Sequence, residues 1–181
     1  MVIPAKRILV WALSVALFLM LPFVAMQYTN EVNWSLFDFL VMGGALLSMG
    51  LVYELIIRQS KQRTYRIAIG IGTAALFLLF WVNSAVGIIG NEAQAVNTLF
   101  WIVPAVILTG AGLSGLKARG MAQTMFIATV VQITVPAIGL FIWPPPTTSW
   151  SPGIFGVFMI TAFFALMMLL SALLFRKVTR S

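Results

Sequence analysis

Six apolar stretches constrain this chain more than any other feature of its sequence. A helix rises about 1.5 Å per residue, so about 20 apolar residues cross a hydrocarbon core of about 30 Å. Each stretch is apolar on all sides rather than along one stripe, as a lipid-embedded helix requires. The stretches are Ile8–Met26, Leu36–Ile57, Ile67–Gly90, Thr98–Leu116, Met121–Ile142 and Ile154–Phe175. The sequence therefore predicts an all-α bundle of six membrane-spanning helices.

Composition excludes several other classes of protein. The chain is 61% hydrophobic and 8% charged, whereas a soluble domain has about 25% charged residues. It contains neither cysteine nor histidine, the residues that supply most zinc and heme ligands. It also lacks the common nucleotide-binding and hydrolase motifs. We expect a membrane protein without catalytic activity, cofactor or metal.

The polar connections between the stretches predict how the helices are joined. They are Gln27–Ser35, Arg58–Arg66, Asn91–Asn97, Lys117–Gly120 and Trp143–Gly153. Connections this short make sequential helices antiparallel neighbours, and none is long enough for a separate aqueous domain. We therefore expect one transmembrane domain over residues 1–181.

The eleven basic residues predict the orientation of the chain. In the six-span arrangement all of them lie on one side: Lys6, Arg7, Arg58, Lys61, Arg63, Arg66, Lys117, Arg119, Arg176, Lys177 and Arg180. Because basic residues stay in the cytoplasm, both termini are predicted to be cytoplasmic. The same positive face favours contact with anionic lipid headgroups, and topology explains it better than nucleic-acid binding does.

Asp38 lies near the outer end of the second stretch, on the side without Lys or Arg. Ser35 precedes it by three residues, which is the spacing of a capping box, and a carboxylate in the first turn favours the helix dipole. An ionisable side chain in a bilayer is also a candidate functional group. Asp38 is therefore predicted as a capping partner of Ser35, with an ion, proton or substrate site as the alternative.

Three further polar residues within the stretches are candidates for a specific role. Glu54 precedes Arg58 by one helical turn, which predicts a structural ion pair. Asn83 and Gln132 lie in the third and fifth stretches, and such amides commonly bond to a neighbouring helix. If their helices converge with the second, Asp38, Asn83 and Gln132 form a candidate ion or substrate site.

Side-chain size predicts which helices pack together. Small residues at four-residue spacing favour close packing of the second to fourth stretches. The sixth stretch is rich in Phe, Leu and Met, so it and the first are expected at the periphery. Asn83, Gly87 and Gly90 recur at helical spacing, which predicts one narrow face. Trp81 and Trp101 are candidate outer-leaflet contacts for a lipid or hydrophobic ligand.

The segment Trp81–Glu92, with Tyr65–Arg66 before it and Arg119–Ala122 after it, resembles an uncharacterised group of small bacterial multi-pass membrane proteins. The resemblance covers approximately the second to fifth stretches. It implies a bacterial inner (plasma) membrane. It implies no role for any residue, because that group has no known activity.

Three functions remain open at this point. The first is a non-enzymatic accessory or assembly component, acting with a protein partner or as a homo-oligomer. The second is a small cation- or proton-coupled transporter or channel that uses Asp38 and Asn83. The third is the binding of a lipid or hydrophobic molecule between helices.

Overall fold

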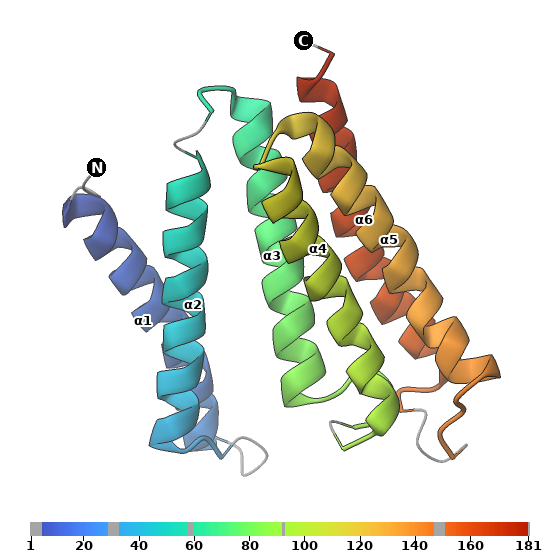
Figure 1. The fold of residues 1–181 in the computed structure, drawn as a ribbon. Helices are drawn as coiled ribbons and strands as arrows, with labels where there is room; N and C mark the ends of the chain where they lie inside the picture. Colours follow the sequence, from blue (N-terminus) through green and yellow to red (C-terminus); the bar gives the residue numbers. More distant parts are fainter. Residues whose placement is uncertain (1–4, 29–32, 58–59, 92, 147–150, 181) are drawn as a thin grey trace. The chain divides into compact units, whose positions relative to one another are not determined.

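A computed structural model of the protein describes residues 5–28, 33–57, 60–91, 93–146 and 151–180, and all regular structure in these residues is helical. The elements are α1 (Ala5–Tyr28), α2 (Leu36–Ile57), α3 (Arg63–Ala85), the 3₁₀ helix η1 (Ala95–Trp101), α4 (Ile102–Ser114), α5 (Ala118–Phe141) and α6 (Ile154–Val178) (Figure 1). With η1 and α4 counted as one span, the described residues contain six helices long and apolar enough to cross a membrane. The predicted all-α, six-span fold is confirmed.

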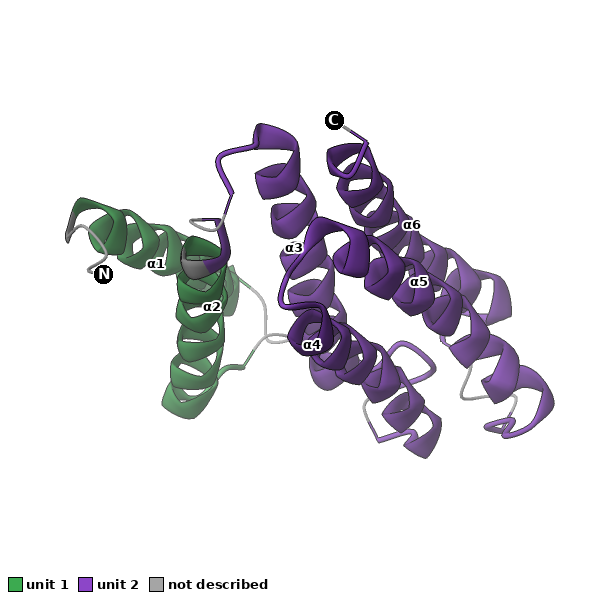
Figure 2. Cartoon of the chain, turned by 45° about the horizontal axis from the view of Figure 1, so that its top comes forward, with its two compact units in different colours: residues 1–55 green, residues 56–181 purple. Residues whose placement is uncertain are grey.

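The chain divides into two compact units, residues 1–55 and residues 56–181 (Figure 2). The first contains α1 and nearly all of α2, and the second contains the remaining helices. Each unit is described by itself below. The expectation of one domain over the whole chain stays a prediction.

In the first unit, α1 and α2 form an antiparallel hairpin. Trp11 packs edge-on against Tyr53 near one end, with ring centroids 6.2 Å apart. Phe23 packs in the same way against Phe39 near the other end, at 6.5 Å. Between them a Cβ atom at Gly50 would lie 2.5 Å from the Trp11 ring, so the glycine lets the indole contact the α2 backbone.

In the second unit, α6 packs against both α3 and α5. The Ser171 hydroxyl of α6 donates a 2.8 Å hydrogen bond to the Ala68 carbonyl of α3. One turn further along α3, a Cβ atom at Gly72 would lie 3.0 Å from Ser171 Oγ and 3.2 Å from Met125 Cε of α5. Gly72 therefore lies where α3, α5 and α6 meet.

The expectation that the sixth helix is peripheral is wrong. Its buried face is Val157, Thr161, Phe164, Ala165, Met168, Ser171, Ala172 and Phe175. The small residues among these let α3 and α5 approach closely. The bulky residues that prompted the expectation include Phe163, Leu166 and Leu170, and these point outward from the unit. Overall composition concealed a buried face that combines these small residues with Phe164, Met168 and Phe175.

The third helix ends five residues earlier than its apolar stretch predicts. It stops at Ala85, and Gly87 and Gly90 follow with φ of +73° and +75°. These left-handed conformations suit glycine and end a right-handed helix. The predicted face of Asn83, Gly87 and Gly90 therefore does not exist, because both glycines lie in the connection after the helix.

Candidate functional site

The start of α2 is a reciprocal capping box between Ser35 and Asp38. The Ser35 backbone N–H and hydroxyl each donate to Asp38 Oδ2 at 2.7 Å. The Asp38 backbone N–H points back to Ser35 Oγ at 3.3 Å. Side-chain oxygens thus satisfy amides that the first helical turn leaves without intrahelical partners. The capping prediction for Asp38 is confirmed, and its carboxylate is exposed at the end of the helix.

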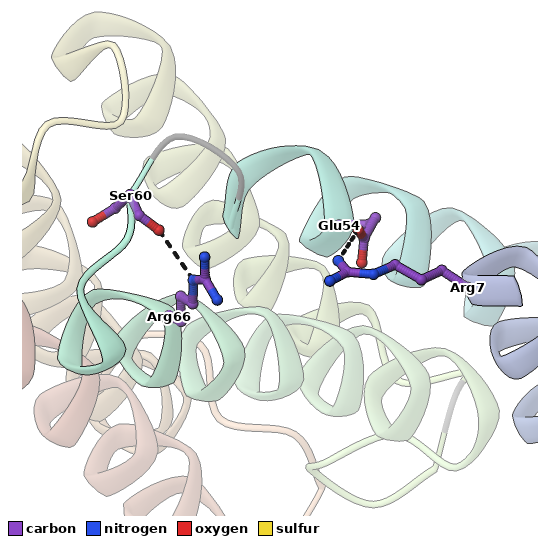
Figure 3. A network of polar contacts seen from close by, with 4 residues as sticks. All are labelled: Arg7, Glu54, Ser60 and Arg66. Carbon is purple, nitrogen blue, oxygen red and sulfur yellow. Dashed lines mark hydrogen bonds and ion pairs between the residues drawn. The ribbon is translucent and has the colours of Figure 1, made fainter. Parts of the chain in front are cut away.

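Glu54 forms an ion pair with Arg7, across the α1–α2 hairpin. The Arg7 guanidinium Nη1 contacts Glu54 Oε1, and Figure 3 shows the two side chains pointing toward one another. The Glu54 side chain is 4% exposed and that of Arg7 is 54% exposed, so the arginine brings its charge from the surface to a buried carboxylate. Arg58, the predicted partner of Glu54, lies outside the described residues. That pair stays a prediction.

The same figure shows a second polar contact, within the second unit. Arg66 Nε donates to the Ser60 carbonyl oxygen at 3.0 Å (Figure 3). Arg66 was expected in the connection between helices, but it lies in the first turn of α3. Its guanidinium therefore holds the segment that enters the helix.

Asn97 of η1 organises the connection between α3 and α4. Its Oδ1 accepts hydrogen bonds from the backbone N–H groups of Ile88 and Ile89, at 3.2 and 2.9 Å. Its Nδ2 donates to the carbonyls of Ile89 and Asn91, at 3.0 and 2.7 Å. Ile88, Ile89 and Asn97 are all buried. The side-chain amide of Asn97 thus supplies hydrogen-bond partners for buried backbone groups outside a helix. Without it these groups would be buried and unsatisfied.

Gly87 allows Asn97 to reach this position. A Cβ atom at Gly87 would lie 2.4 Å from the Asn91 carbonyl and 2.7 Å from Asn97 Nδ2. The close approach and the positive φ both require glycine there. Sequence reasoning placed Asn97 only at the edge of a connection. One sequence signal could have identified this role of Asn97. Glycines interrupt the apolar stretch, and an asparagine follows them.

Asn83 is buried beside this connection. Its Nδ2 donates to the Asn97 carbonyl at 3.2 Å, whereas its Oδ1 is buried without a hydrogen-bond partner. The amide therefore ties the last turn of α3 to η1. This agrees with the expected role of such residues as contacts between helices.

Gln132 lies in the interior of the second unit and is 0% exposed. Among the described residues, neither its Oε1 nor its Nε2 has a hydrogen-bond partner, and the buried Thr161 Oγ of α6 also has none. Gln132 precedes the end of α5 by nine residues and Thr161 follows the start of α6 by seven. The two therefore lie at similar depth from the α5–α6 connection. Within the part of the chain that the structure describes, the interhelical bond expected of Gln132 is not formed.

Trp81 and Trp101 each pack edge-on against a phenylalanine of α3. Trp81 lies against Phe77 with ring centroids 5.7 Å apart, and Trp101 lies against Phe80 at 5.6 Å. Trp101 is the more exposed, at 45%. Both rings therefore contribute to packing at the end of α3. Their predicted contact with a lipid or hydrophobic ligand stays a prediction.

The three residues of the candidate ion or substrate site have different surroundings. Asp38 belongs to the first unit, and Asn83 and Gln132 belong to the second. Asn83 is two residues from the end of α3, and its described bond is to Asn97 rather than to Gln132. A site shared by all three stays a prediction.

Comparison with known protein families, with curated proteins and with solved structures finds no match to this chain.

Proposed function

We propose that this chain is a non-enzymatic accessory or assembly component of a bacterial inner membrane. The observation that carries the proposal is that both carboxylates in the described spans bond to groups of the same hairpin. Asp38 caps its own helix and Glu54 binds Arg7 across the same hairpin. Charged groups within spans are costly and often functional, but these two bond to their own fold.

The proposal includes an orientation and a membrane. All basic residues lie on one side of the six-span arrangement, which supports cytoplasmic termini. The resemblance of the Trp81–Glu92 region to small bacterial multi-pass proteins supports the inner membrane. The part of the protein that contacts a partner is then a membrane-embedded surface.

We assign that surface to the α1–α2 hairpin. In an apolar 18-residue window of each helix, 6% of the residues of α1 and 22% of those of α2 are buried, against 44% for α5. The outward side chains of α1 include Leu13, Leu17 and Leu21, which repeat every four residues and so share one face. Within the first unit α1 buries few residues, and we propose that its long exposed face contacts a partner protein or a second copy.

Photo-crosslinking in native membranes tests this assignment. A photoreactive amino acid is placed at Leu17 of α1 and, as the matched control, at Leu166 of α6; both are apolar, exposed positions. We expect a discrete protein adduct from position 17 and lipid adducts from position 166. Lipid adducts alone at position 17, together with a stable monomer after detergent extraction, would contradict the accessory role.

A transporter or channel is the second candidate, favoured by the unpartnered polar atoms of Gln132 and Thr161. Buried polar groups without protein partners are suited to bind a water or a polar solute. Flux measurements in proteoliposomes test it with Gln132→Leu, and with Asp38→Asn as a second variant. Cation or proton flux in the wild type that both variants abolish, without loss of folding, would replace the accessory role by transport.

A further inference from the structure

A cavity of about 540 Å³ lies between the start of α5 and the end of α6. These two helix ends lie together at one end of the second unit (Figure 1). The residues that matter for its chemistry are Arg119, Gln123 and Phe126 of α5, Leu173 and Arg176 of α6, and Arg180, which lies two residues beyond the end of α6. Its volume falls within the range of about 300–1,000 Å³ that is typical of small-molecule sites.

Three arginines give the cavity a strong positive charge. Residues 93–181 contain no Asp or Glu, so no acidic side chain of this part of the sequence can pair with these arginines. Arg119, Arg176 and Arg180 are all exposed. Guanidinium groups bind phosphate with paired, charge-assisted hydrogen bonds. The charge and geometry of these side chains are therefore suited to an anion from outside the chain.

The wall of the cavity changes from charged to apolar along both helices. On α5 the order from the helix start inward is Arg119, Gln123 and Phe126, which spans about 10 Å at the helical rise. At the end of α6 the order inward is Arg180, just beyond the helix, and then Arg176 and Leu173 within it. Both helices thus place charge at the end of the unit and apolar side chains deeper in the span.

We propose that this cavity binds the phosphate headgroup of an anionic phospholipid. The arginines contact the phosphate, and the first part of an acyl chain lies against Phe126 and Leu173. Basic pockets between membrane helices are suited to such headgroups. A free phosphate would use only the charged end and leave the apolar wall in contact with water. The proposal rests on the membrane embedding and is independent of any protein partner.

The test measures lipid binding to the purified full chain in detergent. Phosphatidylglycerol, phosphatidylcholine with the same acyl chains and inorganic phosphate are titrated separately, and affinity is read by native mass spectrometry and by thermal stabilisation. The site variant is Arg176→Gln with Arg180→Gln. The matched control is Lys177→Gln with Arg63→Gln, which removes the same charge from exposed positions that do not line the cavity.

We expect the site variant to bind phosphatidylglycerol about tenfold more weakly or worse, since charge-assisted hydrogen bonds are lost. The control should keep its affinity within about twofold. Equal weakening in both variants would show diffuse electrostatic attraction and overturn the site. Stabilisation by inorganic phosphate as strong as that by the lipid would overturn the lipid as its occupant. Equal binding of phosphatidylcholine would overturn the role of charge.

A milder variant replaces the double substitution if the double variant does not fold. Arg119→Gln changes one exposed side chain in the first turn of α5. If the double variant is not monodisperse, Arg119→Gln is measured in its place. Weaker binding of phosphatidylglycerol with an unchanged affinity for phosphatidylcholine supports the proposal. An unchanged affinity for phosphatidylglycerol contradicts it.

Discussion

Ser35 and Asp38 bond to each other in both directions at the start of α2. The serine donates to the carboxylate through its backbone N–H and its hydroxyl, and the aspartate N–H points back to the hydroxyl. This reciprocity gives the acid at the predicted outer end of α2 a structural partner within its own turn. An acid that looked like a functional group in isolation is therefore part of a helix start.

Replacing Ser35 by Ala tests the cap. We expect the free energy of unfolding to fall by about 0.5–2 kcal/mol, because the first turn loses a side-chain acceptor. Unfolding in mixed micelles with a denaturing detergent measures the change. Ser48→Ala, an exposed serine within α2, is the control and should have a smaller effect. Equal losses in the two variants would contradict the capping role.

Asn97→Leu tests the buried connection between α3 and α4. The backbone amides of Ile88 and Ile89 lose their acceptor, and each buried unsatisfied donor costs about 1–3 kcal/mol. We expect faster hydrogen exchange at these two amides and a lower free energy of unfolding. Thr98→Val, at the exposed neighbouring residue, should leave that exchange unchanged. Continued protection of Ile88 and Ile89 in Asn97→Leu would refute this role of Asn97.

The contact between α4 and α5 depends on Gly110. A Cβ atom there would lie 2.2 Å from Thr124 Oγ, whereas one at Gly112 would meet nothing within 4 Å. Gly110→Ala should therefore destabilise the protein. Gly112→Ala should be neutral or stabilising by up to about 1 kcal/mol, the helix preference of alanine over glycine. Unfolding of both variants, with Gly110→Ala also made in a Thr124→Ala background for partial rescue, measures this. Similar stability of the two glycine variants would show that the helices are not in close contact here.

Gln132→Leu distinguishes a dry interior from one that binds a polar molecule. The amide is buried and unpartnered, so an apolar side chain of similar length should raise the free energy of unfolding by about 1–3 kcal/mol. Gln123→Leu, at an exposed position of the same helix, should change it less. A clear loss of stability in Gln132→Leu would mean that the amide has a partner, such as a buried water.

The helices could be predicted because a span needs a long apolar run and little else. The second stretch, Leu36–Ile57, matches α2 at both ends. The capping box could also be predicted, since Ser35 and Asp38 interact through sequence spacing alone. Local chemistry of this kind does not require knowledge of the tertiary fold.

Features that depend on tertiary contacts were missed for a physical reason. Gly87 and Gly90 lie in an apolar run, and apolarity does not distinguish a helix from a buried connection held by Asn97. The ion pair of Glu54 with Arg7 joins residues 47 positions apart, and only the antiparallel hairpin brings them together. The pair of Glu54 with Arg58, predicted from helical spacing, lies outside the described residues and stays a prediction.

The most direct test of the six-span topology is the side of the membrane on which each connection lies. Because the sequence contains no cysteine, only an introduced cysteine is labelled. Single cysteines are placed at Gln62 and Thr179 on the basic side and at Ala93 and Ser151 on the other; all four positions are exposed. A membrane-impermeant maleimide is then applied to intact and to permeabilised cells. We expect labelling of positions 93 and 151 in intact cells, and of positions 62 and 179 only after permeabilisation. Labelling of positions 62 and 93 from the same side would contradict the six-span topology.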